Sequence, residues 1–324
     1  MTDRAHSAYS TSGGGTGSST PSLPAIYGGR RLVVYALASI AAAVILAGFW
    51  NYHLVDGFGR DLVAAPAVGD TSGLGGAYAE RGMGFGFIFA AVAGLAATFT
   101  ACNCVVFAML PGLACSVDRH RPSRSPWRAL GAFVGGVTVV CALYGAWVGL
   151  IGSGVEAMNA FRLTQAQVVF SGLGIAMLGW GALELGFLDG LTRRLPERVR
   201  TFFGRVQTKA AVIGVFVGLF AVGRPFPVFR DFMAYAASSD SPLYGAGVMA
   251  VQGIGQILLI VLLFSLMVGF GGRKLMRWSS DHPHKPRLMS GLALLSGGAF
   301  FVFYWGLAFA LDIGRWGFKL GWYG

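Results

Sequence analysis

Cys102 and Cys104, separated by one residue, are the residues of this sequence whose type and spacing most directly suggest chemistry. Thiols exchange with disulfides, and neighbouring soft thiolates can hold a thiophilic ion such as Cu(I) without any histidine. A Cys-x-Cys pair cannot close a disulfide inside a regular helix, because positions two apart point to different sides. In an unwound segment the bond could close, as a strained and easily reduced one. Thiol redox chemistry and copper binding therefore both stay open for this pair.

Two further cysteines lie in or beside apolar runs. Cys115, near the end of one run, and Cys141, inside the next, could act as resolving partners for the thiol pair. Because an unpaired cysteine in an apolar run commonly serves as a small hydrophobic residue, we expect packing roles for both.

Arg224 is the other informative residue, because it lies inside an apolar run. A charge near the centre of a bilayer costs at least ~2.5 kcal/mol unless it faces a cavity or a partner. One hypothesis places Arg224 opposite the cysteine segment, where a cation would lower the pKa of a thiol. The alternative pairs it with local carbonyl groups. Asp231 could pair with Arg224, and Gln252 and Gln256, four apart on one helix face, could bond across helices or line a pathway.

The elements that must position these residues are long apolar runs. The chain is 55% hydrophobic and 12% charged, more apolar than a soluble core of this length could bury, which predicts an all-α polytopic membrane protein. Its 50 glycines let helices approach closely in lipid. The net charge of +11 lies in short connectors, so we expect no nucleic-acid partner. The five histidines lie in tails and connectors, which argues against paired haem ligands.

Seven runs are long enough to span a bilayer. They cover residues 32–50, 84–114, 128–152, 166–187, 210–236, 243–270 and 288–312. The connectors 116–128, 188–209 and 272–287 are rich in Arg and Lys and fall on one side, which the positive-inside rule makes cytoplasmic. The N-terminus is then inside and the C-terminus outside.

The predicted organisation has five parts. They are a disordered tail (1–29), an uncleaved anchor helix with an extracytoplasmic segment (30–83), a first three-helix unit (84–209), a second three-helix unit (210–312) and a C-terminal tail (313–324).

The second and fifth spans are interrupted near their middles. The first break carries Cys102 and Cys104 before Pro111, and the second is Gly223-Arg224-Pro225-Phe226-Pro227. Similar runs precede them, Gly94-Leu95-Ala96-Ala97 and Gly218-Leu219-Phe220-Ala221. The two spans cross in opposite senses, which predicts an inverted repeat with a functional site where the breaks meet. Ordinary proline kinks in packed helices are the alternative.

At these breaks the chain resembles the CcdA/DsbD family of transmembrane electron carriers. The first-unit family pattern, Ser-Pro-Cys followed by apolar residues and Pro-Gly, is similar to the stretch from Ala101 to Gly112. The second-unit pattern, Thr-Pro-Cys-x-x-Pro, falls on Arg224-Pro225-Phe226-Pro227. Phe226 therefore stands where the family has its second cysteine, so the disulfide that the family forms between its units cannot form here.

The resemblance implies a thiol–disulfide electron carrier that supports cytochrome c maturation in the bacterial inner membrane, with thioredoxin-like partners on one or both sides and no cofactor. It implies Cys102 and Cys104 as the catalytic residues. The supporting residues that we predict are Arg224, Pro111, Pro225, Pro227, Asp231 and Gln252.

Two alternative functions stay open. The first is a transporter or chaperone for a thiophilic metal, in which Cys102 and Cys104 hold Cu(I). The second is an accessory subunit of a respiratory membrane complex, which the long tail, the extra first span and the polar segment 51–82 would suit.

Overall fold

The computed structural model describes residues 23–98, 125–155, 161–188, 190, 206–282 and 284–323. All regular elements in these ranges are helices. Six helices are long and apolar enough to cross a membrane, and a bent pair makes a seventh span. They are α2 (Gly29–Gly48), α5 (Tyr78–Ala97), α7 (Ser125–Ile151), α9 (Arg162–Leu185), α14 (Pro242–Asp281), α15 (His284–Phe301) and the pair α12 (Val206–Gly223) and α13 (Pro227–Ala237). The prediction of an all-α polytopic membrane protein is confirmed.

Two helical stretches lie in ranges that the sequence predicted as tail and as connector. The short helix α1 (Leu23–Tyr27) lies in the range predicted as tail, because Leu23 is buried against Leu32 and Leu295. Helix α14 continues through the predicted connector to Asp281, since the next proline in the sequence is Pro283.

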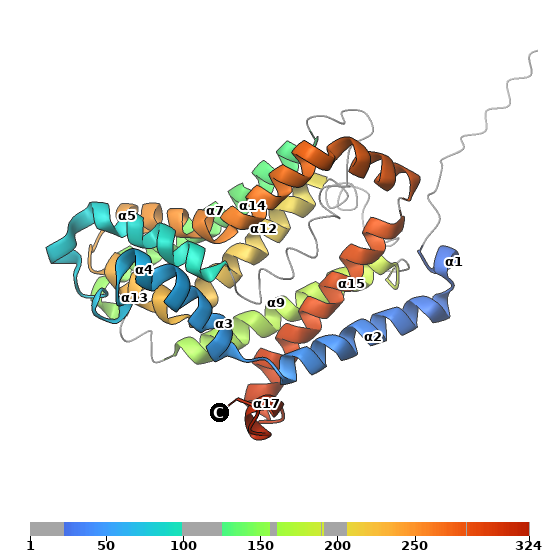
Figure 1. Cartoon of the computed structure of the whole chain (residues 1–324), viewed down its shortest axis with the longest axis horizontal. Helices are drawn as coiled ribbons and strands as arrows, with labels where there is room; N and C mark the ends of the chain where they lie inside the picture. The colour runs from blue at the N-terminus through green and yellow to red at the C-terminus, as the bar shows by residue number, and fades with distance from the viewer. Residues whose placement is uncertain are drawn as a thin grey trace, which may run out of the picture.

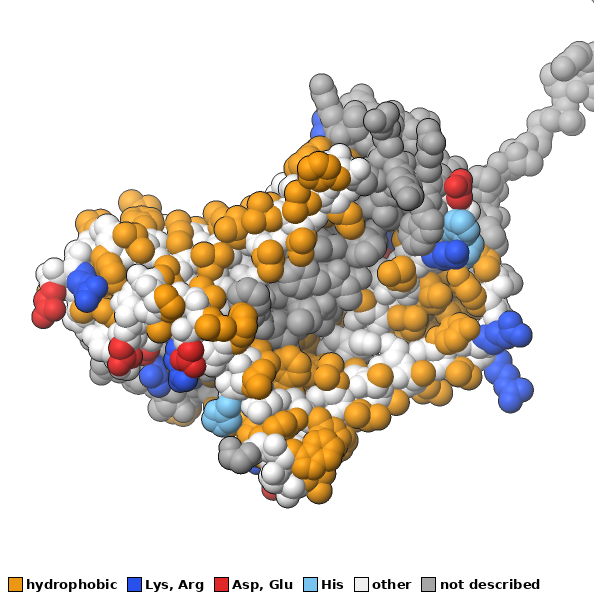
Figure 2. All heavy atoms as spheres, in the orientation of Figure 1, with side chains coloured by type: hydrophobic (Ala, Val, Ile, Leu, Met, Phe, Trp, Pro, Cys, Tyr) orange, Lys and Arg blue, Asp and Glu red, His pale blue; other side chains and the backbone are white. Residues whose placement is uncertain are grey.

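The outer faces of the bundle suit lipid. Large apolar side chains cover much of the surface in Figure 2, and charged side chains gather toward the ends of the helices. Leu150 and Val168, on different helices, are 73% and 68% exposed. A soluble protein would bury such side chains, whereas lipid solvates them.

Helix packing follows the two-fold pattern of an inverted repeat (Figure 1). The first helix of each unit packs on the second helix of the other, α5 on α14 and α12 on α7. The second helices, α7 and α14, pack on each other, and so do the third helices, α9 and α15. These four helix pairs therefore match the packing expected of an inverted repeat.

Two glycines form a close contact between the third helices, α9 and α15. A Cβ on Gly174 would lie 2.9 Å from the carbonyl oxygen of Gly298, and one on Gly298 would lie 2.7 Å from that of Gly174. These two residues are 124 positions apart, the same separation as Gly94 and Gly218 in the similar runs before the breaks. The separation of 124 thus recurs at one contact of the third helices, while Gly181 and Gly291, which also pack together, are 110 positions apart.

The polar segment between the first two spans is folded onto the bundle. It forms α3 (Tyr52–Phe58), a π-helical turn η1 (Gly59–Ala64), α4 (Ala65–Val68) and a 3-10 turn η2 (Thr71–Gly73). We call residues 51–77 the clamp segment. The chain then kinks at Gly82, whose φ is 71°, and the freed carbonyl of Gly82 accepts a hydrogen bond of 2.7 Å from the Tyr235 hydroxyl.

The remaining helical residues close the same end of the molecule. The π-helical turn η4 (Val302–Leu307) and α16 (Ala308–Ala310) extend α15, and α17 (Trp316–Lys319) follows. Trp50, just after α2, contacts Phe300 edge to face, with ring centroids 5.3 Å apart. The C-terminal ends of α2 and α15 therefore meet beside α3 and α17 (Figure 1).

Candidate functional site

The second break bends its span sharply. Helices α12 and α13 meet at 85°, across Arg224, Pro225 and Phe226. Pro225 cannot donate a helical hydrogen bond, and Pro227 begins α13, where a missing N–H costs little. The freed carbonyl oxygen of Arg224 accepts a hydrogen bond of 3.5 Å from Nη2 of Arg162, at the start of α9. The predicted break is present, and a neighbouring helix satisfies its backbone.

The guanidinium of Arg224 forms an ion pair with the carboxylate of Asp56 on α3. The side chains are only 12% and 20% exposed, and the guanidinium also lies 5.6 Å from the centre of the Phe226 ring. Burial raises the pKa of the Asp56 carboxyl, and the charge of Arg224 opposes that rise only in part. The cost of the charge inside an apolar run is thus reduced by a specific carboxylate partner.

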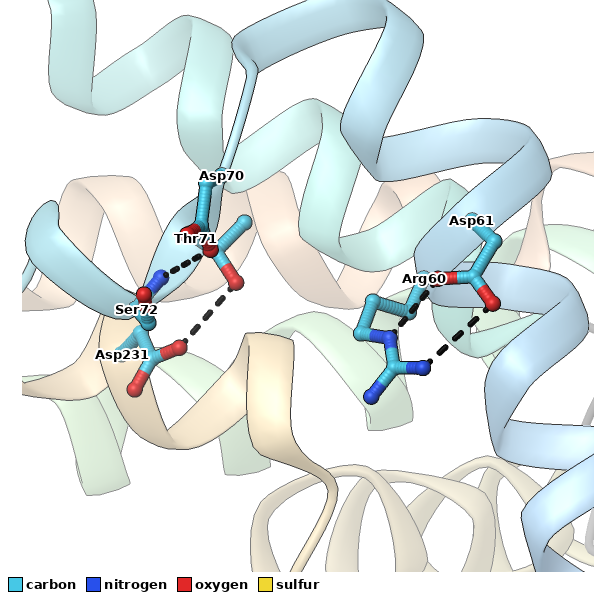
Figure 3. A network of polar contacts seen from close by, with 6 residues as sticks. All are labelled: Arg60, Asp61, Asp70, Thr71, Ser72 and Asp231. Atoms are coloured by element: carbon cyan, nitrogen blue, oxygen red, sulfur yellow. Dashed lines mark hydrogen bonds and ion pairs between the residues drawn. The ribbon is translucent and has the colours of Figure 1, made fainter.

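Asp231 lies on α13 and faces the clamp segment instead of Arg224. Its carboxylate accepts a hydrogen bond of 3.1 Å from the Thr71 hydroxyl on η2, as Figure 3 shows, and lies 3.2 Å from Arg230. Our suggestion that Asp231 pairs with Arg224 is wrong, because the bend at the prolines turns α13 toward η2. Arg60 and Asp61, also in Figure 3, form a more exposed pair in the same segment.

The clamp segment also reaches the end of α5, which leads toward the first break. Gly59 packs so closely on the Ala96 carbonyl that a Cβ there would collide with it. Gly59 is three residues after Asp56, so one short stretch contacts both the end of α5 and Arg224. Cys102, Cys104 and Pro111 lie outside the described residues, as does Cys115.

Gln252 and Gln256 lie beside the end of α5. They are 0% and 3% exposed, and the amide nitrogen of Gln252 donates to the amide oxygen of Gln256 at 3.3 Å. The Thr98 hydroxyl donates to the Gln256 carbonyl at 3.0 Å, four positions before Cys102 in the sequence. Among the described residues the side-chain oxygen of Gln252 has no donor. A buried acceptor thus lies on α14, close to the end of α5.

Cys141 is fully buried on α7 and packs against Gly253 of α14. Its thiol fills the space that a glycine leaves at a helix crossing. The prediction that it is a small buried hydrophobic residue is confirmed.

A cavity of about 280 Å³ lies next to Arg224. Its lining comes from the residue Trp50 after α2, from α3, from α9, from the second break, from α15 with η4, and from Arg315 before α17. The residues are Trp50, Tyr52, Asp56, Leu163, Phe170, Arg224, Pro225, Phe300, Phe301, Tyr304, Trp305 and Arg315. Aromatic rings form most of its wall, and an Arg–Asp ion pair lies at its edge.

Residues 88–304 match the family described as cytochrome C biogenesis protein transmembrane region. The chain belongs to this family. The match begins within α5 at residue 88 and ends within η4 at residue 304, so it includes most of both three-helix units. It confirms the resemblance seen in the sequence. No curated protein and no solved structure gives a significant match.

Several residues of the site lie outside the range that matches the family. Asp56 and Thr71 precede it and Arg315 follows it, so the clamp segment and the C-terminal end are additions to the family region. Sequence reasoning missed Asp56, Thr71 and Arg162 as partners of the second break. Arg162 could have been singled out from the sequence, because an arginine in a connector that is predicted to be extracytoplasmic departs from the positive-inside rule.

Proposed function

We propose that this chain is a transmembrane thiol–disulfide electron carrier that supports cytochrome c maturation. The family supports this function at its own level, because it is defined by the transmembrane region of cytochrome c biogenesis proteins. The thiol pair Cys102 and Cys104 supplies the redox chemistry. Reduced thioredoxin-like protein would give two electrons and two protons to the Cys102–Cys104 disulfide, leaving two thiols here and a disulfide in the partner.

The repeat register favours Cys102 as the residue that reacts first. Phe226 stands at the position of the family's second cysteine, and the separation of 124 between the similar runs at Gly94 and Gly218 also separates Cys102 from Phe226. Cys104 then serves as the resolving thiol. This correspondence is the observation that carries the proposal, because it brings the sulfur-bearing break and the arginine-bearing break to equivalent positions.

Arg224 has a positioning role in this proposal. Its ion pair with Asp56 neutralises much of the charge that it could otherwise place beside a thiol. The pair and the Arg162 bond to the Arg224 carbonyl hold the second break against α3 and α9. Gln252, buried beside the end of α5, offers an acceptor to the segment that carries the cysteines.

The bundle spans a lipid bilayer several times. We place it in the bacterial inner membrane, with the N-terminus inside, because the basic connectors then face the cytoplasm. Thioredoxin-like proteins on the inside would supply electrons, and thiol proteins outside would receive them. The cavity, the clamp segment and α17 would then lie toward the outer side.

Mixed-disulfide trapping tests the proposal. Thioredoxin lacking its resolving cysteine should form a covalent complex with the oxidised wild type by attack on the Cys102–Cys104 disulfide. The Cys104→Ser variant should form the same complex when diamide is added to oxidise the two thiols, and Cys102→Ser should reduce complex formation by at least about 100-fold. Cys141→Ser is the control, because its buried thiol should leave trapping unchanged. Purified chain that traps no thioredoxin but holds one copper per molecule, lost in Cys102→Ser, would establish the metal function instead.

A further inference from the structure

We propose that the cavity beside Arg224 binds the ring of a quinone. The choice of a redox ligand rests on the proposed function, because a quinone and a dithiol exchange the same two electrons and two protons. The binding of a quinone ring is inferred from the cavity itself, which combines aromatic walls with a buried hydrogen-bond donor.

The walls suit a flat apolar ring. Phe170 and Trp305 lie with centroids 4.9 Å apart, and Phe300 stacks on Tyr304 at 5.6 Å with an interplanar angle of 16°. Trp50 closes another side. Aromatic faces and edges interact favourably with a further ring that packs against them. A volume of about 280 Å³ is at the small end of ligand cavities, enough for a ring system but not for a whole lipid.

The charges of the lining select a neutral ligand. Arg224 is paired with Asp56, and Arg315 lies 2.8 Å from Asp312, so both cations already have carboxylate partners. A carboxylate ligand would bring an uncompensated negative charge into an aromatic cavity, which is costly. A carbonyl oxygen carries no such penalty.

Arg224 offers a donor to that oxygen. Its Nη1 atom is buried and has no acceptor among the described residues, although Nη2 bonds to Asp56. A buried N–H group without an acceptor is destabilising. A quinone carbonyl would satisfy it while the ring stacks on the aromatic wall.

A quinone would also supply the electron exchange for which the second unit has no cysteine. The family's second cysteine is Phe226 here, so the second unit has no sulfur with which to exchange electrons. In the proposed exchange the Cys102 and Cys104 thiols lose two electrons and two protons to form a disulfide. The quinone gains both and becomes the quinol; the reverse reaction regenerates the thiols.

Equilibrium binding of 2-methyl-1,4-naphthoquinone to the full chain in lipid nanodiscs tests this site. We expect saturable quenching of tryptophan fluorescence, with affinity at least about tenfold weaker in Arg224→Gln. Arg60→Gln is the matched control, since Arg60 also pairs with an aspartate of the clamp segment but lies outside the cavity. Leu163→Trp, which fills the cavity and leaves Arg224 in place, should abolish saturable binding.

Two outcomes would overturn the site. One is quenching that is unsaturable and equal in all variants, as for simple partition into lipid; the other is tighter binding of 2-naphthoate than of the quinone. Cys102→Ser separates this proposal from the proposed function. It should retain quinone binding and lose thioredoxin trapping, so either property can fail while the other survives.

Discussion

The second and fifth spans begin the two three-helix units that we predict, and their sequences carry different chemistry. The first brings Cys102 and Cys104 after α5, and the second brings Arg224 and Phe226 between α12 and α13. Both follow a glycine that packs against a second helix of the opposite unit, Gly94 on α14 and Gly218 on α7. The glycine contact therefore recurs in both units, while the residues that follow it in the sequence differ.

This difference explains the additions outside the family region. A cysteine at the second break would need no counter-charge, whereas Arg224 inside a membrane span does. Asp56 supplies it from the clamp segment, which precedes the family match. Thr71 holds the same segment to Asp231 on α13. The clamp segment and the arginine break thus form one structural unit.

The largest stability effect is expected from breaking that unit at Arg224. Arg224→Ala leaves the Asp56 carboxylate buried without its partner and should lower the free energy of unfolding by about 3 kcal/mol. Arg60→Ala, which removes an exposed ion pair nearby, should cost less than about 1 kcal/mol. Reversible unfolding in mixed detergent micelles measures both. Equal effects would show that the second break does not depend on its ion pair.

Alanine substitution of the two glycines before the breaks should lower the free energy of unfolding by smaller and unequal amounts. In Gly94→Ala the new Cβ collides with the backbone oxygen of Gln252, which cannot move alone, so we expect a loss of about 2–3 kcal/mol. In Gly218→Ala the Cβ lies 2.8 Å from the Val140 side chain, and about 1 kcal/mol is expected. Gly131→Ala, with nothing within 4 Å, is the control. The same unfolding assay applies, and a larger loss for Gly218→Ala than for Gly94→Ala would contradict the packing described.

The smallest effect concerns pH. Burial holds the pKa of folded Asp56 above its ordinary value of 3.8, so between these two values the folded chain binds more protons than the unfolded chain. Asp56 thus makes the free energy of unfolding fall as pH rises through that window. Asp56→Asn should remove this slope, and the thermal midpoint of the wild type should fall relative to the variant as pH rises above 3.8. A relative rise instead would mean that Arg224 outweighs burial.

Much of the membrane architecture was predictable because long apolar runs and glycine spacing report it directly. The break at Pro225 and Pro227 was equally clear, since proline acts locally on its own helix. The partners of Arg224 and Asp231 were not, because Asp56 and Thr71 are 168 and 160 positions away and lie in a segment without apolar periodicity. Only the folded path of the clamp segment brings them together. Whether Cys102 meets the second break stays a prediction.

Disulfide formation in the Phe226→Cys variant tests that prediction most directly. It restores a sulfur at the family's second position, and the offset of 124 predicts a bond to Cys102 in a Cys104→Ser background under mild oxidation. Phe229→Cys, equally buried three residues further on, should form none. Mass spectrometry of proteolytic fragments would identify the link. A Cys102 thiol that stays reduced in the first variant, or that links equally in both, would contradict the meeting of the two breaks.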